Sequence, residues 1–107
     1  MLHFPDTTPA GEPKLSVDFL KQLPAGVTVL SCVVTCENHD DSAVDDPSPA
    51  ARLSGSPTVT DGKIVTQKFA GGVLDVDYVV IFVATLSDGQ KKVAQGVLSI
   101  VRYLNKH

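Results

Sequence analysis

The sequence predicts an all-β fold, an antiparallel β-sandwich of about seven strands, from three observations. Several short segments are rich in β-branched residues or alternate apolar with polar side chains, as strands do. Turn residues separate these segments at intervals of about eight to twelve residues, which is typical of a sandwich. No segment shows the apolar period of about 3.6 residues that indicates a helix facing a core.

The composition fits one domain and excludes some classes of partner. The chain has 107 residues, a net charge of −3 and 43% hydrophobic residues, so it is large enough to bury about two-thirds of its unfolded surface. Its nine Lys and Arg residues are scattered, and we expect no nucleic-acid partner. The longest apolar run, residues 79–84, is far shorter than the roughly 20 residues of a membrane helix. We expect no membrane segment.

The first thirteen residues are predicted to form an extended N-terminal arm, followed by the sandwich domain over residues 14–103. The arm contains three prolines and a glycine, which prevent a regular element. Such arms order against a partner, and Leu2 and Phe4 are the predicted contacts. The chain also begins without a basic segment followed by an apolar run, so we expect no secretory signal and a cytoplasmic location.

The first strands follow from simple patterns. Residues 14–19 alternate apolar with polar side chains, which predicts a half-buried strand. Residues 27–36 are rich in β-branched residues and largely apolar on both faces, which predicts a second strand. Residues 37–49 are predicted to be a long polar loop. Two short strands are then expected around a turn at residues 60–63.

The clearest predicted element is a C-terminal hairpin around Asp88 and Gly89. Asp-Gly between two apolar runs is typical of a two-residue type I′ turn, because that turn needs positive φ at both central residues. This turn predicts the register of the two strands. It places Val83 opposite Ala94, Ile81 opposite Gly96 and Val79 opposite Leu98.

The strand over residues 78–86 is apolar on both faces, whereas a two-sheet core covers only one face of each sheet. An association surface is therefore expected here, and its candidate residues are Tyr78, Val79, Val80, Ile81, Phe82 and Val83. Two orientations are open. Tyr78 resembles the tyrosine corner of Ig-type sandwiches, which favours Tyr78, Val80 and Phe82 inside, whereas the predicted hairpin register favours the reverse.

The stretch "CENHDDSAVDDP", residues 36–47, contains several possible metal ligands. It lacks the central Gly and terminal Glu of an EF-hand loop, and Cys36 with His39 supplies only two of the four ligands of structural zinc. We therefore predict a solvated loop, with no metal and no cofactor. A looser calcium site remains an alternative, made by Asp40, Asp41, Asp45 and Asp46.

The two cysteines are predicted to be reduced. Cys32 and Cys36 lie about 13 Å apart on one side of the predicted strand, at roughly 3.3 Å per residue, whereas a disulfide needs Cα atoms within about 7 Å. We interpret both cysteines as small residues of the core. The chain also lacks a phosphate loop, a G-x-S-x-G elbow and any other grouping of acid, base and nucleophile. No catalytic residue is predicted, and the chain is expected not to be an enzyme.

Residues 46–101 resemble small uncharacterised proteins encoded among the structural genes of tailed phages and prophages. The shared patterns are turns and strands: Leu53-Ser54-Gly55-Ser56-Pro57, Gln67 with Gly71-Gly72, Val76-x-Tyr78, Thr85-Leu86-Ser87-Asp88-Gly89 and Leu98-x-Ile100. Leu86 is an insertion relative to the usual Thr-Ser-Asp-Gly order. The resemblance implies an Ig-like sandwich that belongs to the head-completion, neck or tail region of a virion.

The expected function is that of a non-enzymatic structural or assembly protein of a tailed phage or prophage virion. Its expected partners are other copies of itself, as a homo-oligomer, or other virion proteins, bound through a sheet face and the N-terminal arm. The expected location is the host cytoplasm during assembly and then the virion. The alternative is a carbohydrate- or calcium-binding β-sandwich module, which is disfavoured because the chain has no Trp and only two Tyr.

Overall fold

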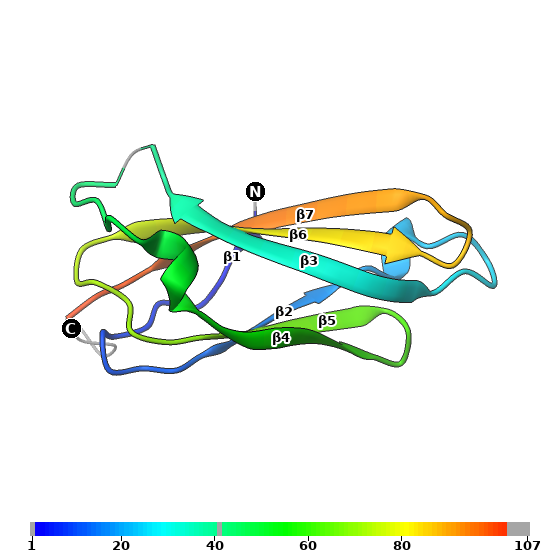
Figure 1. The fold of residues 1–107 in the computed structure, drawn as a ribbon, viewed down its shortest axis with the longest axis horizontal. Helices are drawn as coiled ribbons and strands as arrows, with labels where there is room; N and C mark the ends of the chain where they lie inside the picture. Colours follow the sequence, from blue (N-terminus) through cyan, green and yellow to red (C-terminus); the bar gives the residue numbers. More distant parts are fainter. Residues whose placement is uncertain (1, 41, 103–107) are drawn as a thin grey trace.

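The computed structural model describes residues 2–40 and 42–102, and over these residues the fold is all-β, as predicted (Figure 1). The strands are β1 (Leu2–His3), β2 (Lys14–Asp18), β3 (Val29–Asn38), β4 (Leu53–Thr60), β5 (Ile64–Phe69), β6 (Asp77–Leu86) and β7 (Lys91–Ser99). Two short 3-10 helices, η1 (Leu20–Gln22) and η2 (Pro49–Arg52), complete the elements of the described residues.

The strands form two sheets, which lie as two layers in Figure 1. One sheet has the order β1-β7-β6-β3 and the other the order β2-β5-β4. All neighbouring strands are antiparallel except β1, which runs parallel to β7. Buried side chains of both sheets form one core, and the largest of them are Tyr78, Phe19, Phe69, Phe82, Leu15, Leu86 and Leu98.

Strand β6 alternates strictly between the core and the outer surface, which decides between the two orientations left open by its sequence. Tyr78, Val80 and Phe82 are fully buried, with 0% exposure. They are therefore core residues, and their assignment to an association surface was wrong. Val79, Ile81 and Val83 face outward and are partly exposed.

The hairpin between β6 and β7 has a different register from the predicted one. Val83 lies opposite Val93, and the other β6 residues are displaced by the same single position. The loop has three residues rather than two: the N–H of Gly89 donates to the carbonyl of Leu86 at 3.0 Å, and Gly89 has a φ of 87°. A turn followed by a left-handed residue is the usual three-residue hairpin loop. The one-residue change turns every β7 side chain to the opposite face.

Positive φ at two adjacent central residues occurs instead in the β4–β5 hairpin. Asp61 and Gly62 have φ values of 54° and 68°, and the N–H of Lys63 donates to the carbonyl of Thr60 at 3.1 Å. These are the φ signs that a type I′ turn requires. The predicted turn at residues 60–63 is confirmed.

The N-terminal segment lies against its own domain, which differs from the predicted free arm. Strand β1 pairs with Gly96 and Val97, and the N–H of Phe4 donates to the carbonyl of Val97 at 2.9 Å. Phe4 is only 8% exposed, and its ring centroid lies 6.2 Å from that of Phe82. Phe4 is thus a core residue because it covers apolar surface of its own chain. The side chain of Leu2 lies outside the described part of the structure.

Candidate functional site

The outer face of the four-stranded sheet carries a group of exposed apolar side chains. The pairing of β3 with β6 and of β6 with β7 puts Val33, Val83 and Val93 in one row across the sheet. Val33 is 65% exposed and Val93 57%. Ile81 lies in the next row, between Thr35 and Gln95. We call this surface the β3–β6–β7 face.

A local irregularity in β3 contributes to this exposure. The pairing with β6 shifts between Val29 and Ser31, so the intervening Leu30 leaves the regular alternation and is 64% exposed. Val29, by contrast, is buried in the core. Three of the five large apolar side chains that are most exposed in the described residues, Leu30, Val33 and Val93, therefore belong to the four-stranded sheet.

The two ends of the β3–β6–β7 face differ in charge. At one end Glu37 lies in a row with Val79 and Val97. A hollow of about 220 Å³ opens there, lined by Glu37, Asn38, His39, Asp40, Val79, Ile81 and Gln95. At the other end the row is Ser31, Thr85 and the exposed Lys91. The apolar centre is thus bounded by an acidic end and a basic end.

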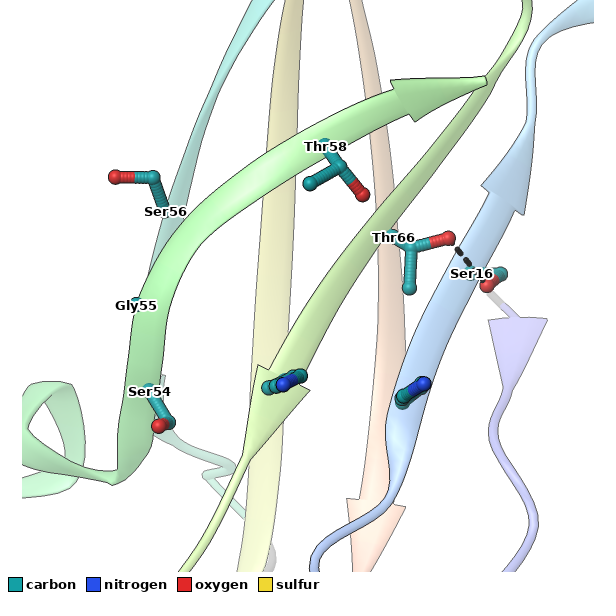
Figure 2. Close-up of a pocket in the computed structure, with 8 residues that line it drawn as sticks. Ser16, Ser54, Gly55, Ser56, Thr58 and Thr66 are labelled. Carbon is teal, nitrogen blue, oxygen red and sulfur yellow. Dashed lines mark hydrogen bonds between the residues drawn. The ribbon is translucent and has the colours of Figure 1, made fainter. Parts of the chain in front are cut away.

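A polar groove of about 550 Å³ lies on the outer side of the three-stranded sheet (Figure 2). It is present because β4 bulges: Ser54 pairs with Lys68 and Thr58 with Thr66, so residues 55–57 face only Gln67. Figure 2 shows β4 curving around this bulge, with Ser54, Ser56 and Thr58 along the groove. The lining residues are Lys14, Ser16, Ser54, Gly55, Ser56, Thr58, Thr66 and Lys68.

The buried Gln67 stabilises this bulge from the core side. Its Nε2 donates to the carbonyls of Ser54 and Gly55, both at 3.2 Å, and to the carbonyl of Lys68 at 2.9 Å. A bulge leaves backbone groups without ladder partners, and the amide of Gln67 satisfies two of them. This role of Gln67 was not predicted from the sequence. The available signal was its position, because Gln67 alternates with Val65 and Phe69 and therefore lies on the buried side of β5.

Two lysines give the groove a positive charge. Lys14 and Lys68 lie directly opposite each other on β2 and β5, and over residues 2–40 and 42–102 neither forms an ion pair. Like charges in this position repel each other and attract anions. The hydroxyls of Ser16 and Thr66 are hydrogen-bonded to each other at 2.8 Å (Figure 2). The groove offers donors but no base or activated nucleophile.

Asp46 occupies the centre of a buried polar cluster, which corrects the prediction of a wholly solvated acidic loop. Its carboxylate accepts hydrogen bonds from Nε of Arg52 at 2.7 Å, from the Tyr78 hydroxyl at 2.7 Å and from the N–H of Ser48 at 2.9 Å. The Asn38 side chain bonds to both backbone groups of Asp46. Asp46 is 1% exposed. Hydrogen bonds from Arg52, above all, hold the pKa of its carboxyl far below the usual range.

Tyr78 connects this cluster to the turn before β6. Its hydroxyl accepts a hydrogen bond from the N–H of Val73 at 3.0 Å while it donates to Asp46. Burial, reinforced by the neighbouring carboxylate, raises the pKa of Tyr78 to about 12. The ring packs edge-on against Phe69, with centroids 5.1 Å apart. The cluster is a structural joint between the loop after β3 and the start of β6.

The remaining candidate ligands are dispersed. Asp40 and Asp45 are exposed, Asp46 is bound to Arg52, and Asp41 lies outside the described residues. Within the described ranges, no group of three or more His, Cys, Asp and Glu side chains is placed to hold a metal ion. Cys32 and Cys36 are free thiols, and burial raises the pKa of Cys36 to about 12.

Comparison with known proteins finds no family model that matches this chain and no curated protein sequence that matches it. In the part of the chain that the structure describes, no helix has the length and apolar character needed to cross a membrane.

Proposed function

We propose that this chain is a non-enzymatic structural or assembly protein with an Ig-like sandwich fold. The orders β7-β6-β3 and β2-β5-β4 correspond to strands G, F, C and B, E, D of an Ig domain. The Tyr78 hydroxyl bonds back to the backbone of Val73, as in a tyrosine corner. Both observations support Ig-like topology, with β1 added beside the last strand.

The β3–β6–β7 face is the proposed contact surface. The observation that carries the proposal is the outward-facing row of Val33, Val83 and Val93, in which Val33 and Val93 are exposed and Val83 is partly exposed. An exposed apolar group on one sheet is characteristic of an interaction site. Each valine contributes about 1.5 kcal/mol or more when fully buried, before the cost of association is subtracted. Many copies in one assembly add such weak contacts together.

The proposed setting is the virion of a tailed phage or prophage, with assembly in the host cytoplasm. The resemblance of residues 46–101 to proteins encoded among phage structural genes supports this setting. The proposed contact surface consists of Val33, Ile81, Val83 and Val93. The N-terminal segment is not part of it, because this segment pairs with its own chain.

The experiment is particle assembly in the phage or prophage that carries this gene. Val93→Asp places a charge in the exposed row, and we expect incomplete particles in electron micrographs together with normal amounts of folded protein. Leu20→Asp is the matched control, because Leu20 is 54% exposed on η1 and lies outside the face. Wild-type particle yields from Val93→Asp would contradict the proposal.

A binding module is the second candidate, and the groove of Figure 2 is the observation that favours it. Its lining contains hydroxyls and two lysines but no aromatic ring, which suits an anionic group better than a neutral sugar. A calcium site in the acidic loop would lack one of its four proposed ligands, since the carboxylate of Asp46 is bound to Arg52. Titration with inorganic phosphate tests the candidate: chemical shift changes at Ser56 and Thr66 that vanish in Lys68→Ala would favour it over assembly.

A further inference from the structure

The β3–β6–β7 face is self-complementary in charge. Glu37 lies on β3 in the row at one end, and Lys91 lies on β7 in the row at the other end. The two residues therefore occupy diagonally opposite corners of the face. In the described residues neither is part of an ion pair. Asp88, in the loop next to Lys91, uses a carboxylate oxygen to accept from the N–H of Gln90 at 3.0 Å.

The dimensions of the face follow from strand geometry. Six residues separate the rows of Glu37 and Lys91 along the strands, which is about 20 Å, and the three strands span about 10 Å across. The Val33 row and the Ile81 row lie between the charged corners. A partner that matches this face must offer an apolar centre between one basic and one acidic corner.

We propose that a second copy of this chain covers the face. A two-fold axis relates the two copies, and it lies in the plane of their interface, between the four-stranded sheet of one copy and that of the other. This inference rests on the proposed assembly function and specifies the partner. An axis perpendicular to the line joining Glu37 and Lys91 brings Glu37 of each copy against Lys91 of the other. By symmetry the pair forms twice. The same axis carries Val93 of each copy onto the region of Ile81 in the other.

The arrangement covers the apolar centre of the face and pairs its two charged corners. The exposed valines are covered in the centre, and the unpaired charges meet at the rim, as in ordinary interfaces. Its area is on the order of 200 Å² per copy from the strand dimensions, about a quarter of the area per partner in a standard interface. The dimer is consequently weak and reversible, and it becomes persistent only at high local concentration.

The inference is tested with charge-reversal variants. Sedimentation of the full chain at increasing concentration measures the dissociation constant of the dimer for each variant. Glu37→Lys and Lys91→Glu should each weaken the dimer by about tenfold or more, since each variant replaces two attractions by two repulsions. The double variant should regain the wild-type dissociation constant, and so should an equal mixture of the two single variants. Added salt should weaken the wild-type dimer. Glu12→Lys and Lys21→Glu are matched controls, because both residues are exposed and lie outside the face.

Each outcome separates this inference from the proposed function. A strict monomer at millimolar concentration would overturn the second copy as partner, while Val93→Asp would still test assembly with another virion protein. A dimer that Val93→Asp disrupts but charge reversal leaves unchanged would overturn the two-fold arrangement alone. Failure of the double variant to recover association, while it remains folded by circular dichroism, would also overturn the inference.

Discussion

At the scale of single residues, the carboxylate of Asp46 is the group on which the buried polar contacts converge. It joins Arg52, Tyr78 and the backbone of Ser48. Asp46→Asn keeps the size but removes the charge, so Arg52 loses the one ion pair that it forms within the described residues. Because the Arg52 side chain is 26% exposed, we expect a loss of about 2–3 kcal/mol in the free energy of unfolding, below the cost at a fully buried pair.

Urea denaturation measures this loss. Asp45→Asn is the control, since Asp45 is exposed and such surface changes are usually within about 0.5 kcal/mol. Equal midpoints for Asp46→Asn and Asp45→Asn would show that the cluster does not stabilise the fold.

The lowered pKa of Asp46 predicts sensitivity to acid. The folded state holds this proton less tightly than the unfolded state, whose carboxyl titrates near 3.9. The stabilisation is therefore complete above about pH 5 and is lost as the pH falls below 4. We expect the wild type to lose more stability between pH 5 and pH 2 than Asp46→Asn does, in thermal melts across this range. Parallel curves for the two proteins would contradict the assignment.

The polar residue types of the acidic loop correctly predicted the exposure of some of its side chains but not of all. Asp40 and Asp45 are exposed, as expected of a polar loop. Asp46 has the same chemistry, and its burial depends on Tyr78, which lies 32 positions away in the sequence. A contact of that separation is set by the packing of the sheets. The sequence could suggest that Tyr78 forms a tyrosine corner, because its backbone partner, Val73, lies only five positions away in the sequence.

At the scale of elements, the bulge in β4 and the amide of Gln67 depend on each other. Gln67→Leu keeps most of the side-chain volume but leaves the carbonyls of Ser54 and Gly55 without this donor. We expect a loss of about 1–3 kcal/mol from their incomplete hydrogen bonding. Chemical denaturation gives the magnitude, and amide shifts at residues 54–58 report the local change. Lys68→Leu on the outward side of β5 is the control; an equal loss there would leave Gln67 with no special role.

Strand positions were predictable, while the register of the last hairpin was not. The alternation in β2 and the β-branched run in β3 have clear signals in the sequence. Asp88-Gly89 is compatible with two- and three-residue loops, which differ by one position in register. The difference changed which β7 residues face outward, so Val93 rather than Ala94 joins the candidate surface.

At the scale of the whole molecule, the N-terminal segment closes one side of the core. Phe4→Ala should lower the free energy of unfolding by about 2–4 kcal/mol, since it removes a buried ring that lies near Phe82. Thermal or urea unfolding of the isolated protein measures the effect. Pro5→Ala is the control, because Pro5 is exposed. A free arm that orders only on a partner would give no change for either variant.

The parallel contact of β1 with β7 has a mechanical consequence. The N–H groups of Phe4 and Thr7 donate to the carbonyls of Val97 and Ser99, and Val101 returns a bond to Thr7. Because the two strands run in the same direction, a pull that separates the ends of residues 2–102 slides one strand along the other. The bonds along this seam then carry the load together rather than breaking one after another. Tension between the two ends of the domain is thus resisted by shear.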